Sequence, residues 1–274
     1  MDAERPMTPL REPADPVTQR SLVADLRALG IQSGTTLLVH SSLSKLGWVA
    51  GGAQAVVLAL LEILGPEGTL VMPAHTAQLS DPSRWSNPSV PEGWWPAIRA
   101  ETPAFDPRLT PSQAMGAVAE AFRGHPEALR SAHPLTSFVA VGAHAADVTA
   151  DHRLGSGFGE HSPLARIYEL DGGVLLLGVG HDNNTSLHLA EDRAEFASKA
   201  RHAEGAPMMT PQGRSWVTFE EVVWSNDDFV ALGKDFAKTG AQGSGRVGDA
   251  TALLMSQRKL VDFGVRWMEG NRSA

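Results

Sequence analysis

Apolar positions near the start of the chain alternate between a helical and an extended period. Residues 18–29 place Leu22, Leu26 and Leu29 on one helical face, and Gly30 follows where helices commonly end. The next predicted elements are a strand, a helix and a strand, at 36–39, 53–64 and 69–72. A β–α–β unit of this kind favours a mostly parallel sheet with helices on both faces.

The alternation continues to the C-terminus, with two interruptions. Further strands are predicted at 138–141 and 173–179, and helices at 113–123, 164–170, 185–199 and 249–267. Residues 76–112 hold many of the prolines and show no clear period. Residues 206–230 are typical of a hairpin or a meander, with a Pro-Gln-Gly turn at 211–213. The sequence therefore predicts an α/β protein with a mostly parallel central sheet and a smaller appendage.

Composition excludes several kinds of chemistry. The chain has 274 residues, a net charge of −8 and no cysteine. Without cysteine there can be no disulfide, thiolate zinc site, iron–sulfur cluster or cysteine nucleophile. The acidic balance argues against nucleic acid as a partner, because phosphate binding needs clustered Lys and Arg, and it is compatible with a cationic ligand.

The N-terminal residues 1–16 are polar and rich in proline, and they are predicted to form a flexible arm ahead of a main domain at 17–274. They lack the apolar stretch of a signal peptide, and no run in the chain approaches the roughly 20 apolar residues of a membrane helix. The sequence therefore predicts a soluble, cytoplasmic protein with no membrane partner.

Three polar segments are candidates for ligand binding. His40, Ser41 and Ser42 follow the first predicted strand, and in open α/β sheets ligands bind at the carboxyl ends of strands. Hydroxyls and free N–H groups there can hold an anion, although an ordinary strand-to-loop exit has the same residues. Arg130 can pair a phosphate, but a surface ion pair is the simpler interpretation of that segment alone. The glycines of 155–159 favour a flexible lid.

The richest candidate segment runs from 178 to 191. A buried strand ends in glycines, a polar turn follows, and His188 falls near the start of the predicted helix, with Glu191 on the same face. The positive helix end disfavours a protonated imidazole, so His188 is placed to act as a general base. One alternative is a core histidine satisfied by a backbone carbonyl. Another is a metal pair with His181, whose seven-residue separation is not a recognised zinc spacing.

Carboxylates gather between 215 and 233, where the chain has no Lys or Arg. Trp216, Phe219 and Trp224 lie among them. Unpaired carboxylates beside aromatic rings suit a polycationic, hydroxyl-bearing ligand, and a solvated hairpin face explains them equally well. The four acids are Glu220, Glu221, Asp227 and Asp228.

Five blocks of sequence together resemble the aminoglycoside 3-N-acetyltransferase family. They lie at 37–73, 112–123, 130–142, 159–191 and 245–268, and the most specific is GEHSPLARIYELDGGVLLLGVGHDNNTSLHLAE at 159–191. The resemblance implies a three-layer α/β/α sandwich with a smaller substrate-facing subdomain, formed by insertions at 76–112 and 206–230. It implies acetyl transfer from acetyl-coenzyme A, as co-substrate and without a metal, to the 3-amino group of 2-deoxystreptamine aminoglycosides. Such an activity confers antibiotic resistance.

The resemblance also implies roles for individual residues. His188 of the HLAE motif is the implied general base, and His161 of the H-S-P motif is implied to be a second catalytic residue near it. Asp81, after the M-P strand, and the acids of 220–228 are implied to bind substrate amines. The implied coenzyme-binding residues are His40, Ser41, Ser42, Leu43, Arg130, His133 and Ser137.

Elementary chemistry is consistent with this reaction. A substrate ammonium must lose a proton before its nitrogen can attack a thioester, and a neutral histidine suits that step. Glu191 is the nearest carboxylate that could orient His188, and Glu220 or Glu221 could do so across space. Because the chain has no cysteine, the acetyl group is expected to pass directly to the amine. The oxyanion needs donors, for which loop N–H groups and three hydroxyls are candidates: Ser41, Ser42 and Thr185.

Two other functions remain open from the sequence. The first is an acetyltransferase of the same fold that acts on a non-antibiotic amine in biosynthesis. The second is a non-catalytic module that sequesters cationic ligands. The sequence is compatible with either a monomer or a homodimer.

Overall fold

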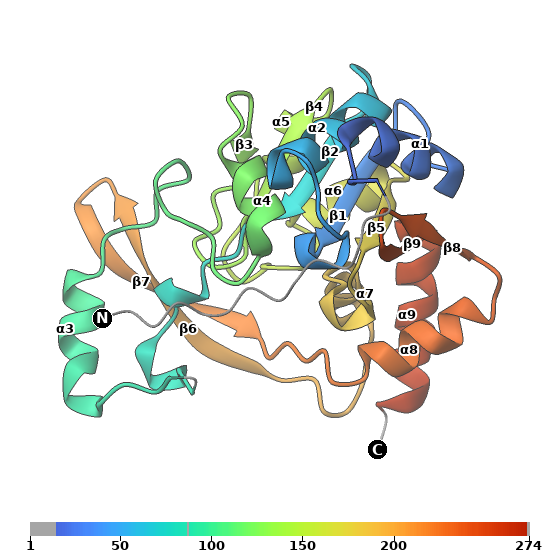
Figure 1. The fold of residues 1–274 in the computed structure, drawn as a ribbon. Coiled ribbons are helices and arrows are strands. Elements are labelled where there is room, and N and C mark those ends of the chain that lie inside the picture. Colours follow the sequence, from blue (N-terminus) through green and yellow to red (C-terminus); the bar gives the residue numbers. More distant parts are fainter. Residues whose placement is uncertain (1–14, 87, 273–274) are drawn as a thin grey trace, which may run out of the picture.

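The computed structural model describes residues 15–86 and 88–272, and a mixed sheet of seven strands forms its centre (Figure 1). The strand order is β3-β4-β2-β1-β5-β9-β8. The predicted strands at 36–39, 69–72, 138–141 and 173–179 are confirmed, the last with a shorter C-terminal end. The seven strands are β1 (Thr36–Ser41), β2 (Thr69–Pro73), β3 (Leu129–Arg130), β4 (Phe138–Gly142), β5 (Gly173–Leu177), β8 (Gln242–Val247) and β9 (Ala250–Ser256).

The expectation of a mostly parallel sheet is wrong. Strand β1 runs parallel to both of its neighbours, β2 and β5, but the pairings β2·β4, β3·β4, β5·β9 and β8·β9 are all antiparallel. The predicted helix at 249–267 is in fact β9 followed by α9 (Gln257–Asn271). A short apolar run does not by itself distinguish a helix from a strand. The two-residue turn before β9 contains Gly248 at φ 54°, a left-handed conformation that glycine adopts at low cost and that suits a hairpin.

Helices cover both faces of the sheet, as predicted (Figure 1). Alternate side chains of each strand serve the two faces: Leu37 and Val39 join one core cluster and Leu38 joins the other. The chain is therefore a three-layer α/β/α sandwich. One face carries α1 (Gln19–Leu29), α2 (Gly52–Leu64) and α4 (Gly116–Arg123), and the other α5 (Ala145–Thr149), α6 (Pro163–Glu169), α7 (Ser186–Arg193), α8 (Phe229–Ala237) and α9.

Capping and glycine signals correctly predicted where α1 ends, but the predicted C-terminal end of α7 is wrong. The Thr18 hydroxyl caps the start of α1, and Gly30, at φ 105°, ends it. Helix α7 stops at Arg193 rather than at residue 199. The Lys199 ammonium folds back to donate to the carbonyl of Asp192 at 2.6 Å, so a side chain takes the place of the expected helical N–H donors.

The predicted hairpin is confirmed, but it occupies 201–222 rather than 206–230. Strands β6 (Arg201–Thr210) and β7 (Gly213–Val222) form a separate two-stranded sheet that extends away from the central sheet beside α3 (Trp95–Glu101) (Figure 1). The Arg214 guanidinium donates to the carbonyl of Thr102 at 2.7 Å and so links β7 to the end of α3. Residues 77–112 and 201–222, as far as they are described, are called the hairpin lobe below. The short 3₁₀ helices are η1 (Leu43–Lys45), η2 (Ala77–Leu79), η3 (Pro82–Arg84), η4 (Glu92–Trp94) and η5 (His181–Asn183).

The predicted arm at 1–16 lies outside the described residues, apart from Asp15 and Pro16. Val17 forms an isolated parallel bridge with Val49 at the start of the described fold. Among the described helices, none combines the length and the apolar character that crossing a bilayer requires.

Candidate active site

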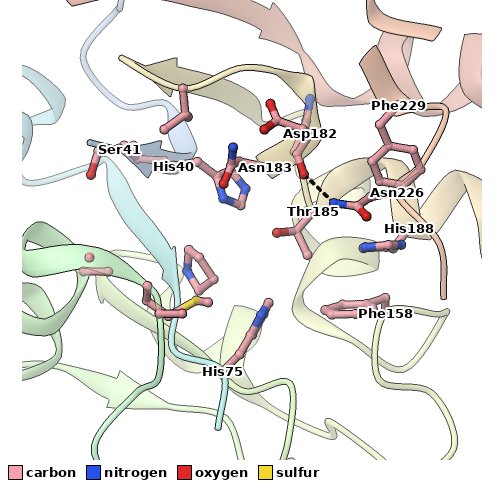
Figure 2. Close-up of a pocket in the computed structure, with 18 residues that line it drawn as sticks. His40, Ser41, His75, Phe158, Asp182, Asn183, Thr185, His188, Asn226 and Phe229 are labelled. Atoms are coloured by element: carbon pink, nitrogen blue, oxygen red, sulfur yellow. Dashed lines mark hydrogen bonds between the residues drawn. The ribbon is translucent and has the colours of Figure 1, made fainter. Parts of the chain in front are cut away.

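The candidate site is a cavity of about 320 Å³ at the carboxyl ends of the three mutually parallel strands. His40 lies near the end of β1, His75 follows β2, and His188 lies on α7, which follows β5. Figure 2 shows the three imidazoles projecting toward this cavity from different sides. Because β2, β1 and β5 are adjacent and parallel, their carboxyl ends meet at one edge of the sheet.

His188 and Glu191 form the strongest polar contact at the cavity. Nδ1 of His188 lies 2.7 Å from Oε2 of Glu191, whose side chain is only 1% exposed. A carboxylate accepts, so Nδ1 carries the proton and Nε2 keeps its lone pair. The sequence predicted this pair from its i, i+3 spacing, and of the three candidate carboxylates it is Glu191 that makes the contact.

Local backbone geometry explains how His188 reaches the cavity. Strand β5 ends at Leu177, Gly178 turns the chain at φ 74°, and η5 leads into α7, where His188 is the third residue. This path places the imidazole in the first turn of α7, at the end of the helix that faces the cavity.

Aromatic rings surround the His188 imidazole. Phe158 stacks on it with ring centroids 4.8 Å apart and an interplanar angle of 15°, while Trp224 and Phe229 contact it at 5.5 and 4.9 Å (Figure 2 shows Phe158 and Phe229). These rings limit the rotation of the imidazole and exclude water from its faces. The glycine-rich segment 155–159 therefore contributes a wall residue, Phe158.

His40 and His75 are held uncharged. Burial, and secondarily the charge of His188, lowers the pKa of His40 to about 3. Burial, followed by the neighbouring His40, lowers the pKa of His75 to about 3 as well. The Nε2 atoms of both rings are buried, and no hydrogen-bond partner for them occurs among residues 15–86 and 88–272. His75 was not predicted from the sequence, although it follows a buried strand in the same way as His40.

A second cavity of about 560 Å³ adjoins the first and shares Ser41 and Gly116 with it. Ser42 and Leu43 line it, so three of the predicted coenzyme-binding residues come together there. Trp48 is 62% exposed at its edge. Gly52, the first residue of α2, also lines this cavity, and α2 has no side-chain cap. The Gly52 N–H donates to the Val49 carbonyl at 2.9 Å, so the next N–H groups of the first turn are the ones that can bind an anion.

Arg130 and Ser137, which were predicted to bind coenzyme, bind the protein itself. The Arg130 guanidinium donates to Ser137 Oγ at 3.0 Å, to the carbonyl of Ala74 at 2.6 Å and to that of Thr110. Ser137 Oγ donates to the same Ala74 carbonyl at 2.8 Å. Burial lowers the pKa of Arg130 to about 10, and Arg130 stays charged near neutral pH. The two residues hold the chain that leads from β2 to His75.

His133 and Glu221 meet in a buried cluster rather than in either cavity. His133 Nε2 lies 3.7 Å from Oε2 of Glu221, and the same oxygen accepts from the N–H of Gly157 at 3.2 Å. Thr136 Oγ1 donates to the Gly157 carbonyl at 3.1 Å. The cluster thus fixes the backbone next to Phe158, the ring stacked on His188.

His161 is not brought into the cavity of His188. Its side chain is 44% exposed and lies 3.4 Å from Asp151, with Arg153 beside it. It lines a separate surface cavity. The H-S-P motif therefore contributes its buried Ser162 and Pro163 to the start of α6, while His161 faces outward.

The predicted substrate carboxylates are distributed differently from expectation. Asp81 is bound by both nitrogens of the Arg99 fork, at 3.0 and 2.7 Å. Burial raises the pKa of Asp81, but hydrogen bonds from Arg99 and Ser83 outweigh burial and lower it. Asp228 is bound in the same way by Arg272, at 2.7 and 2.6 Å. Glu220 and Asp227 are exposed, and neither lines the cavity.

Asp182 lines the cavity and was not predicted. Its side chain is exposed, and no Lys or Arg among the described residues forms a salt bridge with it. Its carbonyl accepts a hydrogen bond from Asn226 at 2.8 Å, which joins η5 to the segment before α8 (Figure 2). No group of three or more His, Asp or Glu side chains suited to a metal ion occurs in the described part of the chain.

Comparison with known proteins gives consistent matches over nearly the whole chain. The family model described as aminoglycoside 3-N-acetyltransferase matches residues 38–269. The Bacillus subtilis protein named SPbeta prophage-derived aminoglycoside N(3')-acetyltransferase-like protein YokD is 42% identical over 259 residues, 94% of each chain. Aminoglycoside N(3)-acetyltransferase VII of Streptomyces paromomycinus is 37% identical over 274 residues, covering 95% of this chain and 94% of its own.

Solved structures match equally well. The crystal structure of the Bacillus subtilis YokD protein has a TM-score of 0.92 and covers 94% of this chain and 95% of that one. A structure described as AAC-IIIb binary with CoASH has a TM-score of 0.85 at 34% identity, covering 95% and 99%. A structure of AAC-VIa bound to sisomicin has a TM-score of 0.83 at 31% identity, covering 95% and 100%.

Proposed function

Because the chain belongs to the aminoglycoside 3-N-acetyltransferase family, we propose that it acetylates the 3-amino group of 2-deoxystreptamine aminoglycosides from acetyl-coenzyme A. The proposal depends on one observation above all: the 2.7 Å contact between His188 and the buried Glu191 at the wall of the cavity. In a chain of this family, such a pair is suited to proton transfer at an attacking amine.

His188 is the proposed general base. The substrate ammonium loses one proton before attack. Nε2 of His188 then accepts a second proton as the nitrogen bonds to the thioester carbonyl carbon. That proton passes to the sulfur as the C–S bond breaks, and coenzyme A leaves as its thiol. Glu191 holds the ring in the required tautomer and stabilises the imidazolium that forms.

The second cavity is the proposed coenzyme site. The N-terminal N–H groups of α2 suit a pyrophosphate, and the exposed ring of Trp48 offers a surface for an adenine or a pantetheine chain. The related AAC-IIIb has been solved with CoASH, which supports a coenzyme A site in this fold. Ser41 borders both cavities, so a thioester bound in the second would meet an amine bound in the first.

Asp182 is the proposed contact for a substrate ammonium near the reacting amine. Of the carboxylates considered, it alone both lines the first cavity and lacks a protein cation. The uncharged His40 and His75 add no positive charge that would repel a polycation. The sisomicin complex of AAC-VIa supports aminoglycosides as the ligand class. Exposed Glu220 and Asp227 remain available to more distant amines.

Direct transfer is the proposed route. The chain has no cysteine that could carry the acetyl group, and the adjoining cavities allow amine and thioester to approach one another. Candidate donors for the tetrahedral oxyanion are the hydroxyls of Ser41 and Thr185, both of which line the first cavity.

The test is thiol release from acetyl-coenzyme A with gentamicin, tobramycin or apramycin. We expect turnover with at least one of them, acetylation at the 3-amino group by mass spectrometry and NMR, and a raised inhibitory concentration in a susceptible host. Turnover with simple amines but with no deoxystreptamine compound would overturn the substrate assignment. Drug binding without coenzyme A binding in calorimetry would contradict an enzymatic role.

A further inference from the structure

Arg272, the residue that ends α9, reaches the carboxylate that holds His188. Nη1 of Arg272 donates to Oε1 of Glu191 at 2.6 Å. Its Nε and Nη2 donate to the two oxygens of Asp228 at 2.7 and 2.6 Å. The Arg272 side chain is 11% exposed. The four residues therefore form a continuous chain of hydrogen bonds from the cavity to the C-terminal helix.

Both carboxylate oxygens of Glu191 have hydrogen-bond donors. One oxygen accepts from His188, and the other accepts from Arg272 and from the N–H of Ser225 at 3.1 Å. Among the described residues, Arg272 is the only Lys or Arg in ion-pair contact with Glu191. A carboxylate that is 1% exposed stays ionised only when such partners compensate for its lost hydration.

We propose that Arg272 is a positioning residue whose charge, transmitted through Glu191 and moderated by Asp228, sets the pH at which His188 takes up a proton. The inference rests on the proposed role of His188 as general base. It concerns residues 81 positions apart in the sequence, whose contact no local motif indicates.

The sign follows from the charges. The guanidinium opposes protonation of the His188–Glu191 pair, because it adds a positive charge within hydrogen-bond distance of Glu191. Its removal increases the affinity of the pair for a proton, wherever in the pair that proton resides. Removal of the Asp228 charge has the opposite effect, since Arg272 is then less neutralised.

Other groups near the pair do not duplicate this control. Across the cavity, burial holds His40 and His75 uncharged, and the rings of Phe158 and Trp224 that contact His188 carry no charge. Asp182 lines the same cavity, and its carboxylate is exposed to solvent, where interactions are more strongly screened.

Burial by itself would lower the pKa of Arg272. Hydrogen bonds to Asp228 and Glu191, together with their charges, outweigh burial and raise it. The guanidinium is therefore a permanent charge at every pH at which the enzyme would work.

The experiment compares two substitutions of opposite charge effect. Arg272→Gln is expected to move the acid limb of the kcat/KM–pH profile to higher pH by about one unit, and Asp228→Asn to move it to lower pH by a smaller amount. Arg272→Lys keeps the charge but not the fork, so its acid limb should stay close to that of the wild type while kcat falls. Opposite shifts of the acid limb in the two variants are the diagnostic result. Loss of a purely structural contact would not make the direction of the shift depend on the charge removed.

A second readout separates this inference from the proposed function. The imidazole of His188 is titrated by NMR in the free protein, with His188→Ala identifying its signal. Opposite shifts of the titration midpoint in the two variants support the inference even if no aminoglycoside is acetylated. Shifts in the same direction, or none, in variants that melt as cooperatively as the wild type overturn it. If Arg272→Gln does not fold, the test is a lower titration midpoint in Asp228→Asn beside a wild-type midpoint in Arg272→Lys, and an unchanged midpoint in Asp228→Asn overturns the inference.

Discussion

The cavity at the strand ends and the hairpin lobe differ in how their carboxylates are paired with cations. At the cavity, Asp182 forms no salt bridge with any Lys or Arg of the described residues. In the lobe, Asp81 is held by the Arg99 fork, and Glu204 accepts from the backbone N–H of Asp81 at 2.9 Å. Proximity to a substrate-facing surface is therefore not enough for a carboxylate to bind a substrate ammonium. Whether the protein has already neutralised it decides what it can bind.

The largest expected effect falls on the cavity. His188→Ala should lower kcat by roughly 10²–10⁴-fold and leave the KM for the aminoglycoside nearly unchanged. The reason is that the imidazole takes part in proton transfer in the transition state and contributes little to substrate binding. Steady-state kinetics with a deoxystreptamine substrate measures both quantities.

The matched control is His144→Ala. His144 is 42% exposed, is paired with Asp147 and lies outside both cavities. Its kinetics should equal those of the wild type. If His188→Ala behaved like this control, His188 could not be the base.

An intermediate effect distinguishes the two regions directly. Asp182→Asn should raise the KM for an aminoglycoside about tenfold, since one charge-assisted contact to an ammonium is lost. Asp81→Asn should change KM less and instead lower the free energy of unfolding by about 0.5–1 kcal/mol, because it breaks a partly exposed ion pair with Arg99.

Kinetics and urea unfolding on both variants provide the measurement, and KM for acetyl-coenzyme A serves as the internal control. The comparison between cavity and lobe fails if Asp81→Asn raises the drug KM more than Asp182→Asn does.

The smallest effect concerns stability against pH. Burial lowers the pKa of His40 to about 3, compared with about 6.5 in an unfolded chain. Below pH 6.5 the His40 side chain is protonated in the unfolded state but not in the folded state. Its contribution to the free energy of unfolding is therefore fully present above pH 6.5 and is lost progressively toward pH 3. From this group we expect about 1 kcal/mol less unfolding free energy at pH 5.5 than at pH 7.5.

In His40→Gln the pH dependence of unfolding should be weaker by that amount, whatever the variant's stability at pH 7.5. Urea titrations at both pH values test it. A pH dependence identical to that of the wild type would show that His40 is hydrated or paired in the folded protein.

Short-range features were the most predictable. The His188–Glu191 pair follows from spacing on one helix turn, and the capped start of α1 follows from Thr18 and Gly30. The wrong predictions arise where one pattern of apolar residues is compatible with two kinds of secondary structure or strand pairing. The apolar residues of β9 were interpreted as helix, and the sheet was expected to be mostly parallel because one β–α–β unit was extrapolated to its outer strands.

The acidic segment shows the limit most clearly. Its lack of Lys and Arg is visible in the sequence, which suits a polycationic ligand and a solvated hairpin face equally well. In the fold, Asp228 forms an ion pair with Arg272 at the end of α9. Glu221 accepts a hydrogen bond from the N–H of Gly157, which lies in a loop distant in sequence. Neither partner is close in sequence, so neither could be counted in advance.

The sequence alone determined the family resemblance and the α/β class, because motifs and apolar periods are written along the chain. It also predicted the contact between His188 and Glu191, because the two residues lie within one turn of a helix. Only the tertiary structure decided which charges remain free. In the described part of the chain it gave Asp182 no Lys or Arg partner, paired Asp81 with Arg99 and Asp228 with Arg272, and placed Arg272 next to Glu191. Ion pairs form across the fold between groups that packing brings within a few ångströms, and charge along the chain does not record those distances.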